Sequence, residues 1–97
     1  MKLLVMPQAM EDLDGIEEFI GLDNPIAAIN FIEKLTQRFD ELVDMPGMGR
    51  KRDDLAPGLR SSRVGDYLIF YRVSGDKLEV IHVLHGAQDL PRFFDQD

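Results

Sequence analysis

Apolar residues near the start of the chain recur at the spacing of an amphipathic helix. Ala9, Leu13, Ile16 and Ile20 are separated by four, three and four residues, with mostly acidic side chains between them. That spacing places all four on one helix face. Gly15 interrupts the same segment at a cost of about 0.5–1 kcal/mol relative to alanine. It marks either a close approach to a neighbouring group or a tolerated weak point.

A second apolar stripe follows a strong helix-start signal. Asn24 suits the N-cap position, and Pro25 suits the first helical position, where its missing N–H group loses no hydrogen bond. Because the connection is short, the two stripes predict an antiparallel helical hairpin whose apolar face needs a sheet to cover. The second stripe consists of Ala28, Phe31, Ile32, Leu35, Phe39 and Leu42.

Four further segments have the composition of strands. Residues 2–6 (KLLVM) predict a short buried strand. Residues 59–64, 67–74 and 77–85 predict three antiparallel strands, the last two joined by a two-residue turn at Gly75. That turn would place Arg72 opposite Glu79 and Ser74 opposite Lys77, and the opposite charges of the first pair support this register.

Strict alternation along the last two strands gives two largely apolar faces. One face would hold Tyr67, Ile69, Tyr71, Val73, Leu78, Val80, His82 and Leu84. The other would hold Leu68, Phe70, Arg72, Glu79, Ile81, Val83 and His85. The helical hairpin can cover only one of them, and residues 89–94 (DLPRFF) are few for the other. We therefore expect an uncovered apolar face of the kind that marks a partner site.

Together these elements predict a single α+β domain over residues 1–97. The expected order is an N-terminal strand, an antiparallel helical hairpin and a three-stranded antiparallel meander with a short C-terminal helix, the helices being packed on one face of the sheet. The chain has no cysteine, which excludes disulfides and thiolate zinc sites. Its N-terminal apolar run is too short for a signal sequence or a membrane span, so we expect a cytoplasmic protein without membrane contact.

Charge is unevenly distributed along the chain. Residues 1–44 carry ten acidic and three basic side chains, whereas residues 45–97 carry eight of each, which gives a net charge of −7. An acidic N-terminal half argues against strong binding to free nucleic acid, because phosphate neutralisation supplies most of that affinity. Yet five of the eleven basic residues gather in one loop and the next strand: Arg50, Lys51, Arg52, Arg60 and Arg63.

The order of elements resembles the RelE/ParE superfamily of bacterial toxins. The stretches "EDLDGIEEFI", "DNPIAAINFIEKL", "LVDMPGMGRKRDDLAPGLRSSRVGDYLIFYRV" and "LEVIHVLHGAQDL" are similar to its ParE branch in particular. The resemblance covers nearly the whole chain and implies a toxin of a type II toxin–antitoxin pair. It further implies a ParD-like antitoxin as partner in a hetero-oligomer and DNA gyrase as target.

We expect the basic residues to form a positive rim beside the uncovered sheet face. Such a rim would meet acidic groups of the antitoxin or of the gyrase–DNA complex through charge-assisted hydrogen bonds. A solvated loop with no binding role is the alternative for residues 50–52. The expected target- or antitoxin-binding residues are Arg50, Lys51, Arg52, Arg60, Arg63, Phe70, Arg72 and His85.

Members of the RelE branch cleave messenger RNA on the ribosome, and this is the alternative function. A metal-free nuclease needs a base, an acid and cations around the scissile phosphate, for which Arg60, Arg63 and His85 are the candidates. The set is thin, since no tyrosine is present in the C-terminal tail and alternation puts Tyr67 and Tyr71 opposite to His85. Catalysis by a metal-free endoribonuclease is therefore the alternative and not our leading expectation. A third possibility is a member that binds antitoxin but has lost toxicity.

Several of these residues also have purely structural interpretations. His82 lies between valines and is expected to be a hydrogen-bonded core histidine. Tyr71 is expected in the core, with its hydroxyl reaching an edge. Arg60 lies within a strand, so it needs either a bound partner or an internal carboxylate to meet its charge. The carboxylate candidates are Asp53, Asp54 and Asp66. No metal site and no cofactor are expected, because histidines on opposite faces cannot share an ion.

Overall fold

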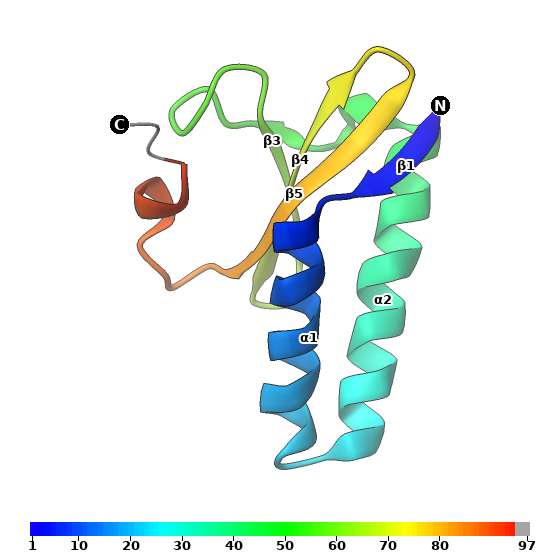
Figure 1. Ribbon diagram of the computed structural model, residues 1–97, viewed down its shortest axis with the longest axis vertical. Helices are drawn as coiled ribbons and strands as arrows, with labels where there is room; N and C mark the ends of the chain where they lie inside the picture. The colour runs from blue at the N-terminus through cyan, green and yellow to red at the C-terminus, as the bar shows by residue number, and fades with distance from the viewer. Residues whose placement is uncertain (95–97) are drawn as a thin grey trace.

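The computed structural model describes residues 1–94 and has the expected α+β architecture. A helical hairpin lies on one face of a five-stranded sheet, and a short C-terminal segment lies on the other side (Figure 1). The helices are α1 (Pro7–Gly21) and α2 (Pro25–Asp44), and the strands are β1 (Lys2–Val5), β2 (Arg50–Lys51), β3 (Arg60–Val64), β4 (Tyr67–Ser74) and β5 (Lys77–His85). Short 3₁₀ turns occupy Pro46–Met48 and Leu90–Phe93.

Local sequence signals set the helices and the last hairpin as expected. The Asn24 side chain accepts a hydrogen bond from the Ala27 N–H group at 3.0 Å and so caps α2. Gly75 adopts a φ of 62° in the turn between β4 and β5, a conformation that glycine tolerates best. Arg72 lies opposite Glu79 and forms an ion pair with it at 2.8 Å. The predicted register at the start of the hairpin is therefore confirmed.

The sheet has the order β1-β5-β4-β3-β2, with β1 parallel to β5 and the other pairs antiparallel. Two details differ from the sequence prediction. β1 is an edge strand with mostly exposed side chains rather than a buried one, because only β5 flanks it. β2 pairs for two residues with β3 and makes the basic segment the opposite edge of the sheet.

A β-bulge in β5 changes which side chains share a face. Tyr71 pairs with Val80 but Phe70 pairs with His82, so Ile81 is an extra residue with no partner opposite. Strict alternation was therefore wrong beyond Ile81. The bulge moves four side chains to the faces opposite to those predicted: His82, Val83, Leu84 and His85.

Each face of the sheet supports its own hydrophobic cluster. On the helix face, Ile69, Tyr71 and Val80 are fully buried under α1 and α2. On the second face, Phe70 and Leu84 are buried beneath Phe94, with the loop after β2 and the C-terminal segment around them. The expectation of an uncovered apolar face was wrong, because residues 53–59 and the C-terminal segment together supply the missing layer.

The closed end of the helical hairpin projects beyond the sheet (Figure 1). Three apolar side chains there are strongly exposed: Phe19 at 71%, Leu22 at 83% and Ile26 at 71%. The exposed apolar surface was predicted on the sheet, whereas the structure has it at the closed end of the helical hairpin. Among the described helices, none combines the length and apolarity needed to cross a membrane.

Candidate functional site

The basic edge of the sheet consists of Arg50, Lys51 and Arg60. Arg50 and Lys51 are exposed on β2, and Lys51 lies opposite Arg60 of β3. Two adjacent strands thus present three cationic side chains along one margin. Charges in such an exposed position steer acidic partners and fix orientation more than they add affinity.

Arg60 also holds the turn that precedes the basic edge. Its Nη1 donates to the Gly49 carbonyl oxygen at 2.7 Å and to that of Gly47 at 3.4 Å. Backbone carbonyls therefore meet part of its charge, and the proposed internal pair with Asp53, Asp54 or Asp66 is not formed. The 3₁₀ turn Pro46–Met48 is thereby tied to β3.

Tyr71 also holds the turn at residues 46–49, through two hydrogen bonds of its hydroxyl group. Its hydroxyl donates to the Pro46 carbonyl oxygen at 2.7 Å and accepts from the Gly49 N–H group at 2.9 Å. The side chain is fully buried, as predicted. Burial raises the pKa of Tyr71, although the hydrogen bond from Gly49 and the charge of Arg60 act in the opposite direction. The phenol is therefore a protonated structural anchor.

Arg52 turns away from the basic edge toward the second face. It forms a two-point ion pair with Asp54, with both N–O distances at 3.1 Å, and its guanidinium carbon lies 5.7 Å from the centre of the Phe70 ring. The hydrogen bond and charge of Arg52 lower the pKa of the Asp54 carboxyl. Phe70 itself is fully buried, so its expected place on an open binding surface was wrong.

The candidate nuclease residues do not converge. Arg60 pairs with Tyr71 and lies on the helix face, whereas Arg63 pairs with Leu68 and lies on the second face. His85 lies beyond the bulge, where its Nδ1 accepts a hydrogen bond from the Ala87 N–H group at 3.0 Å. No pair among these three side chains is joined by a hydrogen bond in residues 1–94.

The bulge nevertheless brings Tyr67 to His85. The two residues are paired across β4 and β5, and their ring centres lie 5.1 Å apart in an edge-on arrangement. The prediction that they occupy opposite faces was therefore wrong. Burial and the nearby charge of Asp66 raise the pKa of Tyr67, which keeps the phenol protonated at neutral pH.

Arg72 lies at the far end of the hairpin, away from the basic edge. Its pairing with Glu79 already compensates its charge, although its side chain remains 53% exposed. The eight residues predicted to form one binding surface are therefore dispersed. Only Arg50, Lys51 and Arg60 share one edge of the sheet, with Lys51 and Arg60 on the helix face and Arg50 on the second face, while the rest are paired, buried or located elsewhere.

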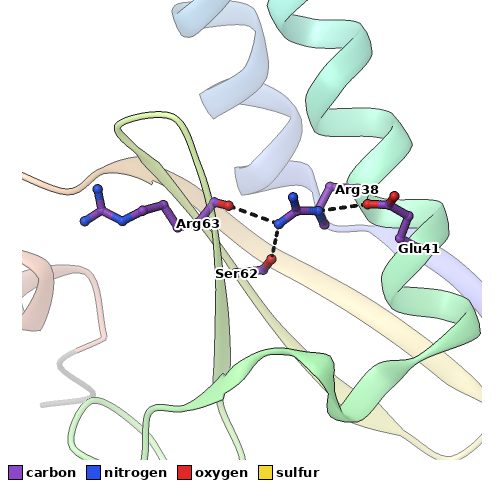
Figure 2. A network of polar contacts seen from close by, with 4 residues as sticks. All are labelled: Arg38, Glu41, Ser62 and Arg63. Carbon is purple, nitrogen blue, oxygen red and sulfur yellow. Dashed lines mark hydrogen bonds and ion pairs between the residues drawn. The ribbon is translucent and has the colours of Figure 1, made fainter.

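A second arginine group, missed in the sequence, closes the open side of β3. Arg38 of α2 donates from Nη1 to Ser62 Oγ at 2.7 Å and to the Arg63 carbonyl oxygen at 3.0 Å, while its Nε donates to Glu41 at 2.9 Å. Figure 2 shows these contacts, with the Arg63 guanidinium directed away from Arg38. β2 ends opposite Ser61, so the Arg63 carbonyl oxygen has no partner strand on that side. Arg38 supplies the missing hydrogen-bond donor.

The Arg38 group borders a hollow of about 550 Å³ between α2 and β3. Met45 and Met48 provide an apolar margin, and Glu41 and Asp44 make part of the lining acidic. The hollow adjoins Gly49 and so continues from the turn that Arg60 and Tyr71 hold. The basic edge and this hollow together form the candidate binding surface.

His82 is the hydrogen-bonded buried histidine that the sequence predicted. It is 8% exposed, and its Nδ1 lies 2.8 Å from Asp12 Oδ2. Within residues 1–94, no group of three or more histidine, cysteine, aspartate or glutamate side chains is arranged to hold a metal ion.

Comparison with known proteins gives a consistent result. Residues 3–90 match the family model described as the ParE toxin of the type II toxin–antitoxin system parDE. Toxin ParE1 of Mycobacterium tuberculosis H37Rv is 30% identical over 96 residues, which cover 94% of this chain and 95% of the relative. Toxin ParE3 of Caulobacter vibrioides is 32% identical over 83 residues, or 81% and 80% of the two chains. A solved structure described as a chromosomal ParDE TA system from P. aeruginosa has a TM-score of 0.78 at 20% identity, covering 88% of this chain and 95% of the other.

Proposed function

This chain belongs to the ParE toxin family of type II toxin–antitoxin systems, and from that membership we propose that it inhibits DNA gyrase and is neutralised by a ParD-like antitoxin. Both would take place in the cytoplasm. The proposed toxin acts by binding and needs no cofactor of its own.

One observation supports inhibition by binding over RNA cleavage. Arg60, one of the two cations of the nuclease hypothesis, has its guanidinium directed at the carbonyl oxygens of Gly47 and Gly49. Arg63 extends from the opposite face of the same strand. General acid–base cleavage requires its groups within hydrogen-bond reach of one phosphate, and this arrangement spreads them apart.

The candidate binding surface offers the features that a protein target would recognise. Arg50 and Lys51 are exposed and presented by a strand rather than by a loose loop. The neighbouring hollow adds apolar contact through Met45 and Met48, which are 63% and 45% exposed. A cationic rim beside exposed methionines suits an acidic surface with an apolar centre.

The test is a supercoiling assay with purified gyrase, relaxed plasmid and ATP. We expect the wild-type protein to inhibit supercoiling, and the Arg50→Glu/Lys51→Glu double variant to lose most of that inhibition while keeping its melting temperature. Lys34→Glu, a charge reversal of the same sign at an exposed α2 position outside the lining of the hollow, serves as the control. Undiminished supercoiling at a large excess of wild-type protein would contradict the proposal.

The contact between Tyr67 and His85 favours a second candidate, the ribosome-dependent nuclease. A phenol and an imidazole 5.1 Å apart are two groups that could exchange protons with a substrate. Induction of the protein in bacteria separates the two functions. Gyrase inhibition predicts filamentation and a DNA-damage response with translation continuing, whereas the nuclease predicts cleaved messenger RNA within minutes. Normal growth with retained antitoxin binding would identify a member that has lost toxicity.

A further inference from the structure

A second hollow, of about 510 Å³, lies along the exposed side of α1 near the end of β5. Its lining includes Glu11, Gly15 and Phe19 from successive turns of α1, Tyr67 and His85 from the β4–β5 end, and Phe93 from the C-terminal segment. Residues of β5 after the bulge and of the C-terminal segment form the wall opposite the helix. The hollow is separate from the candidate binding surface beside α2 and β3.

Gly15 lies at the centre of the helical side of this hollow. It is inside α1, where glycine weakens a helix, and its φ is not positive. A Cβ atom built at this position would meet no heavy atom of the described chain within 4 Å, apart from the adjoining backbone. No packing contact or backbone conformation within residues 1–94 therefore requires glycine here. The space in front of Gly15 is open to a group from outside the chain.

The chemistry around Gly15 suits a flat cation. Glu11 is exposed at one end of the hollow and supplies a carboxylate. Phe19 is 71% exposed and Phe93 is 36% exposed, and with Tyr67 they supply aromatic surface. Aromatic faces beside a carboxylate bind a guanidinium through cation–π contacts and an ion pair at once.

The acidic side chains of α1 further favour a cationic ligand over an anionic one. The first 44 residues carry ten acidic and three basic side chains, and α1 contributes five of the acidic ones. An anionic ligand would meet repulsion along the whole helix. A purely apolar ligand would gain nothing from the Glu11 carboxylate at the mouth of the site.

We propose that this hollow receives an arginine side chain of the antitoxin, with Gly15 leaving room for the antitoxin backbone to approach α1. The source of the arginine rests on the proposed function, whereas the selectivity of the hollow for a guanidinium does not. The candidate binding surface beside α2 would then remain available for a different contact.

The first experiment tests the hollow alone. N-acetyl-arginine amide is titrated into the ¹⁵N-labelled protein, with N-acetyl-citrulline amide as an uncharged probe of the same shape. The arginine probe should shift the amide resonances of Gly15 and Phe19 and bind in roughly the millimolar range expected for one side chain. The citrulline probe should bind at least several-fold more weakly. Equal shifts with both probes would overturn the proposal.

Variants assign the binding to these residues. Gly15→Leu fills the hollow with a good helix former and should weaken the arginine probe about tenfold or more without lowering the melting temperature. Glu11→Gln should weaken the probe several-fold, whereas Glu18→Gln, on the same helix but outside the lining, should not. Unchanged probe binding by Gly15→Leu would overturn the assignment.

The second experiment uses the full chain and the ParD-like antitoxin of the proposed function. Gly15→Leu should weaken the complex about tenfold or more, and Glu18→Gln should leave it unchanged. If the antitoxin binds wild type and Gly15→Leu equally, the proposed contact is wrong even when the free probe binds. If wild type binds no antitoxin, the proposed partner is wrong, and the contact proposed with it falls as well. The probe titration then shows separately whether the hollow selects a guanidinium.

Discussion

Asp12 and His82 join the first helix to the last strand across 70 residues of sequence. Asp12 Oδ2 lies 2.8 Å from His82 Nδ1 and accepts a second hydrogen bond from the Val83 N–H group at 2.9 Å. Because a carboxylate accepts hydrogen bonds, this geometry assigns the Nδ1 hydrogen to His82. The imidazole also lies edge-on to Phe93 and Phe94 with ring centres 5.6 Å away. One carboxylate thus helps position α1, β5 and the C-terminal segment.

Removing that carboxylate is expected to destabilise the domain. Asp12→Ala loses both hydrogen bonds and leaves the mostly buried His82 ring without its partner, at a cost of about 2–3 kcal/mol. Urea denaturation of Asp12→Ala, His82→Ala and the double variant measures the coupling between the two side chains. Asp14→Ala, an exposed change on the same helix, should stay within about 0.5 kcal/mol of wild type. Additive effects of Asp12→Ala and His82→Ala would contradict the coupling.

Gly49 and Gly47 differ sharply in the space available for a side chain. A Cβ atom at Gly49 would overlap the hydroxyl oxygen of Tyr71, whereas one at Gly47 would meet no heavy atom within 4 Å. Gly49→Ala should therefore break the contacts between Tyr71 and the turn and cost about 1–3 kcal/mol. Gly47→Ala should be nearly neutral. Thermal melting of both variants checks this, and equal effects would mean that Tyr71 does not constrain the turn.

The Tyr71 hydroxyl predicts a loss of stability at alkaline pH. The pKa of Tyr71 is raised in the folded state, chiefly by burial, so the folded chain holds this proton more tightly than the unfolded chain does. Stability from this group is therefore fully present below the ordinary tyrosine pKa of about 10 and is lost as pH rises through the folded value. Denaturation midpoints from pH 8 to pH 11 should fall less steeply for Tyr71→Phe than for wild type.

The same variant has a separate effect at neutral pH. Tyr71→Phe removes the partner of the buried Gly49 N–H group and of the Pro46 carbonyl, which should cost about 1–3 kcal/mol. Tyr67→Phe is the matched control, because the pKa of Tyr67 is also raised by burial but its hydroxyl does not hold the turn. A wild-type pH profile in Tyr71→Phe would show that Tyr71 is not a source of the alkaline loss.

Variants of Arg60 and Arg50 should have different effects, the first on the stability of the fold and the second on target binding. Arg60→Ala removes the donors to Gly49 and Gly47 and should cost about 1–2 kcal/mol, since charged groups form the stronger hydrogen bonds. Arg60→Lys should recover part of this loss because one ammonium can still reach a carbonyl. Arg50→Ala should change the melting temperature little while weakening gyrase inhibition. Similar melting losses in Arg60→Ala and Arg50→Ala would show that the turn does not depend on Arg60.

The sequence predicted those features that depend on neighbouring residues. The Asn24 cap and the pairing of Arg72 with Glu79 each rest on signals a few positions apart, and both are present. Arg38 was missed because it lies on the polar side of α2 and contacts β3 residues 24 and 25 positions away. The exchange of faces beyond Ile81 was missed because both predicted faces of β5 are largely apolar, so the pattern carries no mark of an extra residue.

Ile81 acts as a spacer within β5. Because Ile81 and His82 face the same layer, deleting Ile81 would leave each later residue on its present face. It would, however, remove the local bend and added twist that the bulge places between Val80, which pairs with β1, and His82. Asp12 reaches His82 from the helix that follows β1, so this bend helps set how the carboxylate and the imidazole meet. The strand should therefore tolerate exchange of the Ile81 side chain far better than loss of the position.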